Sequence, residues 1–395
     1  MLLQKIRATL AANSVSLILH ALLFAGLGGL LMWQLGDLTP GYAVIEQATH
    51  HASTPLKTIY DNPLNAPFTL VNHALLYLNQ ESLFLARTIT VTLSALTLGV
   101  FYLLIRSWHG ARTATYATIL FGTSALFLHT ARLGTPMVLS YLLFLIMAAG
   151  FWLKQQQSRL AIFFVCLLAA LLLYVPGMII FLVVAAIWQW KVLDETFKKH
   201  LGIVSLGALL FTAAIAPLAW ALYRQPELIK LWAGLPASGL PEMMVILKNA
   251  ALVPVHLFVH NQANPVSWLG TAPILDVFTI AMLAAGILAY CKSIKLRRTQ
   301  SLIAFFIMMA GLIALGGPIT LVVLLPFLYV LVAGGIYYTL DQWLTVFPRN
   351  PIARWFGIGL FSLLVLCATS YHLRHYFIGW PQARTTTESF TVQKP

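Results

Sequence analysis

The chain has 395 residues, of which 60% are hydrophobic and 9% are charged, whereas a soluble protein carries roughly a quarter charged residues. This composition excludes an ordinary soluble domain and predicts an all-α protein that crosses a membrane many times. The formal net charge of +13 does not indicate a nucleic-acid partner, because the basic residues lie in short clusters between apolar segments.

Apolar runs of about 20 residues, the length needed to cross the hydrocarbon core of a bilayer, occur about eleven times. The first run is too long for the apolar core of a secretory signal, so we expect an uncleaved first helix. The sequence YVPG at residues 174–177 predicts a tight turn between the fifth and sixth runs. The expected spans lie near residues 14–35, 82–105, 113–131, 136–153, 160–174, 176–190, 201–222, 274–291, 300–316, 318–338 and 355–371.

The distribution of lysine and arginine predicts the orientation, because these residues are enriched in cytoplasmic loops. Basic residues recur at alternate ends of the expected spans, which places the N-terminus in the cytoplasm and the C-terminus outside. Two long loops, residues 36–81 and 224–273, are then external, and we expect the chemistry there. The basic residues at the expected cytoplasmic ends are Lys5, Arg7, Arg106, Arg112, Lys154, Arg159, Lys191, Lys198, Lys199, Lys292, Lys295, Arg297, Arg298, Arg349 and Arg354.

This orientation divides the chain into three regions. Residues 1–223 form a transmembrane module whose first external loop, 36–81, carries the expected active site. Residues 224–273 form the second external loop, with a surface helix expected there. Residues 274–395 supply the last spans and a short external tail.

The first external loop opens with DLTPGYAVIEQATHH, residues 37–51. Its apolar residues Tyr42, Ile45 and Ala48 recur at roughly helical spacing, which predicts a helix along the membrane surface. A second amphipathic stretch follows Pro63 and is too interrupted by polar residues to span. A loop with two surface helices is typical of a structure that frames a site.

Three short motifs follow this loop in order: Ala86-Arg87, the basic turn HGARTA at 109–114, and FGTSALFLHTARLGTP at 121–136. Together they resemble the membrane module of GT-C glycosyltransferases of the protein O-mannosyltransferase and aminoarabinose-transferase type. The aromatic tail HYFIGWP at 375–381 is similar to a segment that follows a late span in those proteins. The resemblance covers roughly residues 36–155.

The resemblance implies transfer of a sugar from a polyprenyl-phosphate carrier to a glycan, lipid or protein acceptor on the external face. In such enzymes an acidic residue of the first loop acts as general base on the acceptor. Glu46 is the first choice, and Asp37 and Asp61 are alternatives. Each could instead solvate a loop or a surface helix. Met137 stands where these families commonly have an aspartate.

Cations near the membrane surface would bind the lipid phosphate, and the planar fork of arginine suits two phosphate oxygens. Arg132 and His129 lie at the outer end of the third expected span, and Lys57 is a loop alternative. A snorkelling interfacial arginine is the other interpretation of Arg132. Arg87 lies inside a span, where a charge needs a partner. That partner is a loop carboxylate, Glu46 or Asp61, or the substrate phosphate.

The resemblance also predicts a groove for the sugar and the prenyl chain. Its walls would be lined by aromatic and histidine side chains of both external loops, namely Tyr42, His50, Trp232, His256 and Trp268.

Two histidine pairs are candidate zinc ligands, His50 with His51 and His256 with His260, and the second pair has the i, i+4 spacing that shares one helix face. No acidic ligand is nearby in sequence, so we assign no metal, with a divalent ion as the alternative. The expected partners are the lipid-linked sugar, the acceptor and membrane lipids. The absence of Asn-x-Ser/Thr sequons and the compact loops favour a bacterial plasma membrane. The alternative function is a non-catalytic relative of the same fold, such as a transporter or scaffold for lipid-linked intermediates.

Overall fold

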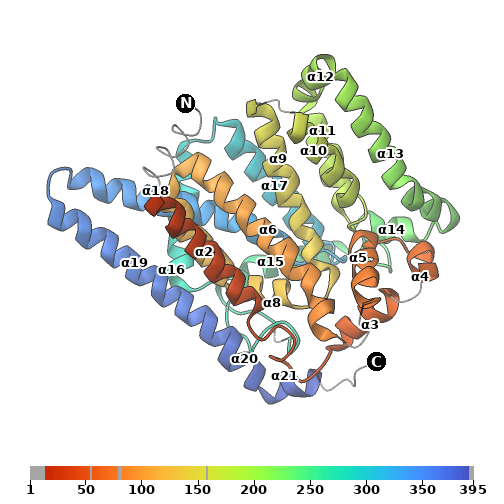
Figure 1. The fold of residues 1–395 in the computed structure, drawn as a ribbon, viewed down its shortest axis with the longest axis horizontal. Coiled ribbons are helices and arrows are strands. Elements are labelled where there is room, and N and C mark those ends of the chain that lie inside the picture. Colours follow the sequence, from red (N-terminus) through yellow and green to blue (C-terminus); the bar gives the residue numbers. More distant parts are fainter. Residues whose placement is uncertain (1–13, 54–55, 79–81, 157–158, 263, 391–395) are drawn as a thin grey trace.

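The computed structural model describes residues 14–53, 56–78, 82–156, 159–262 and 264–390, and throughout these ranges the protein is helical with no β-sheet (Figure 1). Among the described residues, five helical segments are long and apolar enough to cross a membrane. The protein therefore has the architecture of a polytopic integral membrane protein. The five segments are Leu83–His109, Pro136–Gln155, Leu201–Arg224, Leu321–Val346 and Pro351–Gln382.

Each apolar run that was expected to span lies mostly in helix, and five of these runs coincide with the five spanning segments. The helices of the first half are α2 (Ser14–Met32), α3 (Val44–Ser53), α4 (Leu56–Asp61), α5 (Ala66–Leu76), α6 (Leu83–His109), α7 (Ala111–Thr123), α8 (Ala125–Arg132), η1 (Pro136–Tyr141), α9 (Leu142–Gln156), α10 (Arg159–Leu172) and α11 (Met178–Trp188). The predicted turn at 174–177 separates α10 from α11, and Gly177 adopts the positive φ of 79° that this turn requires.

The second half of the chain is also mainly helical. Its elements are α12 (Trp190–Lys199), α13 (Leu201–Arg224), α14 (Leu228–Trp232), α15 (Met243–Phe258), α16 (Val277–Lys292), α17 (Arg297–Ala314), η2 (Leu321–Leu324), α18 (Leu325–Val346), α19 (Pro351–Arg374), the π-helical turn η3 (His375–Gly379), α20 (Trp380–Gln382) and α21 (Arg384–Ser389).

The helices α16 and α18 pack so closely that their backbones touch. A Cβ atom added at Gly286 would overlap the Leu331 carbonyl oxygen, and one added at Gly335 would overlap that of Met282. Small residues allow this close approach between apolar helices. In contrast, the spanning window of α13 is only 11% buried, so most of that helix faces outward.

Both segments of the first loop that were predicted to be helical are helices, α3 and α5. The helices α3 and α5 pack against each other. Asn72 Nδ2 donates to Ser53 Oγ at 3.1 Å, and a ring nitrogen of His73 lies 2.7 Å from the Ser53 carbonyl oxygen. Pro67 is in the first turn of α5, where a missing N–H costs nothing.

The third expected span is not one helix but two, because the chain is extended at Ser124 between α7 and α8. The N–H of Ala125, which the break removes from the helical ladder, lies 3.4 Å from His372 Nδ1 of α19. The helix in the second expected external loop, α15, packs against the apolar helix α17 and is not confined to a surface position. Asn249 Nδ2 of α15 donates to the Ala314 carbonyl oxygen at 3.0 Å.

Candidate functional site

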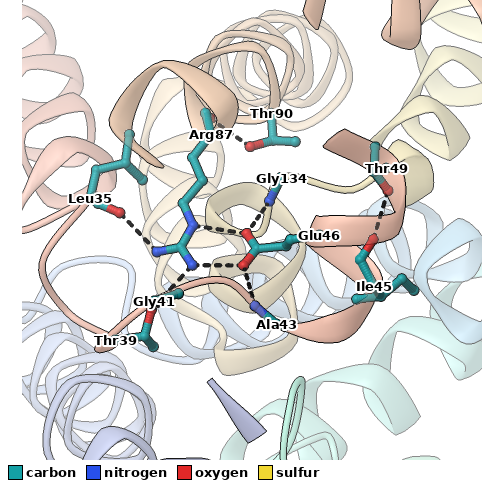
Figure 2. A network of polar contacts seen from close by, with 10 residues as sticks. All are labelled: Leu35, Thr39, Gly41, Ala43, Ile45, Glu46, Thr49, Arg87, Thr90 and Gly134. Atoms are coloured by element: carbon teal, nitrogen blue, oxygen red, sulfur yellow. Dashed lines mark hydrogen bonds and ion pairs between the residues drawn. The ribbon is translucent and has the colours of Figure 1, made fainter. Parts of the chain in front are cut away.

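The polar network in Figure 2 centres on an ion pair between Glu46 of α3 and Arg87 of α6. Arg87 donates from Nε to Oε1 of Glu46 and from Nη2 to Oε2, both at 2.8 Å. Only 2% of Glu46 and 3% of Arg87 is exposed. This two-point geometry is the strong form of a guanidinium–carboxylate contact. It confirms Glu46 among the three partners expected for Arg87.

Backbone donors occupy the remaining lone pairs of the Glu46 carboxylate. Gly134 N donates to Oε1 at 2.7 Å, and Ala43 N donates to Oε2 at 3.2 Å. Arg87 Nη2 also donates to Thr39 Oγ1 at 3.1 Å. Because a carboxylate accepts about four hydrogen bonds, no lone pair of Glu46 is left for an acceptor hydroxyl.

The local sequence explains why Glu46 is held in this position. Glu46 is the third residue of α3 and reaches back to the N–H of Ala43, which immediately precedes the helix; this is one half of a capping box. The glycine at position 134 lets its backbone approach the carboxylate. A Cβ there would lie 3.1 Å from the Ala86 carbonyl oxygen and 3.4 Å from Glu46 Oε1.

Two arginines hold the C-terminal end of α2. Arg87 Nη1 donates to the Leu35 carbonyl oxygen at 3.0 Å. Arg132, the last residue of α8, donates from Nη1 to the Leu30 carbonyl oxygen at 3.2 Å and from Nη2 to that of Trp33. The last carbonyls of a helix lack backbone partners and carry partial negative charge, so cations are favourable there.

Arg132 differs from Arg87 in having no acidic partner. Within the described ranges, no carboxylate oxygen lies within 4.0 Å of its guanidinium nitrogens. Its Nε is buried without a hydrogen-bond partner, and its guanidinium carbon lies 4.8 Å from the centre of the Phe377 ring and 5.3 Å from that of Tyr376. Carbonyl oxygens and aromatic faces therefore compensate this charge, and donor capacity remains.

His129, on the preceding turn of α8, is enclosed by aromatic rings. The ring centroids of Trp380, Tyr376 and Trp268 lie 4.6, 4.7 and 5.8 Å from that of His129. Both ring nitrogens of His129 are buried without a hydrogen-bond partner. The structure thus brings the predicted residues Arg132, His129 and Trp268 together with the C-terminal aromatic tail.

The remaining predicted residues lie in several places. Tyr42 and His50 are buried beside Glu46, with their rings 5.8 Å apart. Burial raises the pKa of Tyr42, and the Glu46 carboxylate adds to the effect. The side chains of Asp37, Lys57 and Asp61 are all exposed, the first in the turn after α2 and the other two on α4.

Two predicted groove residues do not join this cluster. Trp232 packs on α10 and donates from Nε1 to the Leu173 carbonyl oxygen at 2.8 Å. His256 contacts His260 at the end of α15, with its Nδ1 3.1 Å from the His260 carbonyl oxygen.

A second acidic group in the interior, the partly buried Asp276, was not predicted from the sequence. Its carboxylate caps α16 by accepting from Phe278 N at 2.9 Å and Thr279 N at 3.0 Å, and it lies 3.0 Å from His372 Nε2. Because His372 Nδ1 faces the Ala125 N–H, the Nε2 atom carries the proton donated to Asp276. An aspartate directly before an apolar run was the available signal for the cap.

In the part of the chain that the structure describes, no three His, Cys, Asp or Glu side chains gather into a metal site. No protein-family profile, no curated protein sequence and no solved structure matches the chain.

Proposed function

We propose that the protein is a GT-C-type membrane glycosyltransferase that transfers a sugar from a polyprenyl-phosphate carrier to a glycan, lipid or protein acceptor. The main support is that Arg132 is a buried cation without a carboxylate partner in the described ranges. It lies one turn from His129, whose ring nitrogens have no hydrogen-bond partner. A buried charge is costly unless compensated, and a phosphate diester would supply the missing negative charge.

The proposal places this site on the extracytoplasmic side, in a chain of about eleven spans whose N-terminus is cytoplasmic, as in a bacterial plasma membrane. The positive-inside distribution of loop charges supports this orientation. The order of motifs from Arg87 to Arg132, and the contact of α8 with the aromatic tail, support the GT-C assignment.

The general base in this proposal is Asp37, with Glu46 as the alternative. All four acceptor positions of Glu46 are occupied, so it would have to lose a partner before taking a proton. Asp37 is exposed, and the described residues make no ion pair with it. It lies two residues after Leu35, whose carbonyl Arg87 binds, and four after Trp33, whose carbonyl Arg132 binds.

The test is a transfer assay with the purified protein in nanodiscs, using a panel of polyprenyl-phosphate-linked sugars and mass spectrometry of the products. Asp37→Asn is expected to lower the rate by roughly 10²-fold or more. Arg132→Gln is expected to raise KM for the lipid donor. Glu227→Gln, a change of an exposed carboxylate near α14, is the control. No product with any donor, or full activity in both variants, would contradict the proposal.

The second candidate is a non-catalytic protein that binds or moves lipid-linked intermediates. The full occupation of Glu46 favours it, because the carboxylate then acts as part of the scaffold. It predicts transfer of the lipid carrier between leaflets without a new glycosidic bond, and normal function after Asp37→Asn.

A further inference from the structure

The helix α12 (Trp190–Lys199) carries two distinct faces that the proposed transfer site does not use. It begins two residues after α11 ends, and α13 begins two residues after it ends. Figure 1 shows α12 at the end of α11 and α13 that is far from α4 and α14. A short helix between the ends of two apolar helices lies at the depth where the membrane meets water.

One face of α12 is apolar and uncovered. Trp190, Leu193 and Phe197 follow one another at three- and four-residue spacing, which places them on one side of a helix. Their exposed fractions are 68%, 36% and 52%. The protein itself covers a different side, where Thr196 is buried.

The side of α12 away from the apolar face is charged. At 100° per residue, Glu195 projects opposite to the midpoint of the apolar face, and Lys191 and Lys198 project from the flank between the two. Asp194 lies 2.7 Å from Lys198 and pairs with it across one turn. Tryptophan with lysine on an amphipathic helix is the composition of helices that lie in the headgroup region.

The charge of this end of the protein is positive. From residue 154 to residue 199 the chain has five basic residues, Lys154, Arg159, Lys191, Lys198 and Lys199, and two acidic residues, Asp194 and Glu195, which gives a net charge of +3. The N-terminal end of α10 lies at the same end as α12, because α10 and α11 are antiparallel neighbours joined by the 174–177 turn. The surrounding charge therefore complements an anionic surface.

We propose that α12 is an interfacial helix that binds the headgroups of anionic phospholipids. Its apolar face enters the boundary of the acyl chains, and its lysines contact the lipid phosphates. The inference is independent of the proposed glycosyltransferase activity, because it concerns the other end of the helices and uses none of the residues of the transfer site.

The first experiment measures lipid selection. The full-length protein is extracted from nanodiscs of equal parts phosphatidylcholine and phosphatidylglycerol, and the retained lipids are counted by native mass spectrometry. Lys191→Glu with Lys198→Glu is expected to lower the retained phosphatidylglycerol by roughly fivefold or more. The matched control, Lys230→Glu with Lys248→Glu, makes the same charge change on exposed residues of α14 and α15 and is expected to retain lipid as the wild type does.

The second experiment measures depth and does not depend on lipid retention. Nitroxide labels are placed on Phe197→Cys and, separately, on Glu195→Cys, with Cys166, Cys291 and Cys367 changed to alanine. In nanodiscs, label 197 is expected to collide with oxygen and label 195 with a water-soluble nickel chelate. Equal nickel accessibility of both labels would overturn the proposal. It would mean that the apolar face of α12 does not enter the membrane and binds a protein partner instead. Unchanged phosphatidylglycerol retention in the lysine variant would also overturn it.

Discussion

Arg87 and Glu46 are 41 residues apart in the chain, yet their side chains form a two-point ion pair that is almost completely buried. The pair joins α3 of the first loop to α6, a membrane-spanning helix. Removing one partner of a buried pair leaves the other charge uncompensated, which is more costly than the pair itself is stabilising.

Glu46→Gln and Arg87→Gln are therefore each expected to destabilise the protein by about 3–5 kcal/mol. Reversible unfolding in mixed detergent micelles measures the difference. The double variant Glu46→Leu with Arg87→Met is expected to lose less than the sum of the single losses, because it leaves no buried charge. Asp194→Asn, which breaks an exposed pair, is the control and is expected to cost at most about 0.5 kcal/mol. Additive losses would show that the two side chains are not coupled.

The backbone of Gly134 donates to Glu46 at a distance that leaves little room for a side chain. Gly134→Ala is expected to lower the free energy of unfolding by about 1–3 kcal/mol, because its Cβ would press on the Ala86 carbonyl oxygen. Gly150→Ala in α9 is the matched control, since nothing lies within 4 Å of its Cβ position, and helix propensity alone applies there. The same thermal-unfolding midpoint for both variants would refute the close approach.

The contact between α16 and α18 depends on glycine at positions 286 and 335. Gly286→Ala and Gly335→Ala are each expected to separate these helices and reduce the yield of monodisperse protein, because the added methyl would overlap a carbonyl oxygen of the facing helix. Gly99→Ala in α6 has open space around its Cβ position and is expected to behave as the wild type in size-exclusion chromatography. Wild-type behaviour of the first two variants would contradict the observed packing.

Asp276 both caps α16 and binds His372. Asp276→Ala is expected to cost about 3 kcal/mol, the sum of a lost cap of about 1 kcal/mol and of a buried His372 N–H left without an acceptor. Asn350→Ala removes the exposed cap of α19, where the Asn350 side chain accepts only from Ala353 N among the described contacts, and is expected to cost about 1 kcal/mol. Chemical denaturation in detergent compares the two. Equal losses would mean that the His372 contact adds nothing.

Apolar length predicted the helices of this protein well, because a chain in lipid must satisfy its backbone within each segment. The helical spacing around Ile45 likewise predicted α3. The cost of placing Arg87 in a span predicted that it has a partner, and Glu46 was among the candidates.

Other features depend on contacts between distant residues. The break at Ser124 exposes the N–H of Ala125, and its acceptor, His372, is 247 residues away. The occupation of Glu46 depends on the backbone of Gly134, 88 residues away. Neither contact leaves a local pattern in the sequence, so the occupied state of Glu46 could not be predicted from its own segment.

The bonds at the end of α2 also determine an order of events during synthesis. The carbonyl oxygens of Leu30 and Trp33 accept from Arg132, which is synthesised 102 and 99 residues later. The carbonyl oxygen of Leu35 accepts from Arg87, which is also synthesised later. The helix α2 therefore leaves the ribosome before the arginines that bind its end have been made. A nascent chain that stops before α8 lacks the group that anchors α2, so α2 gains its last bonds only after several later helices have been made.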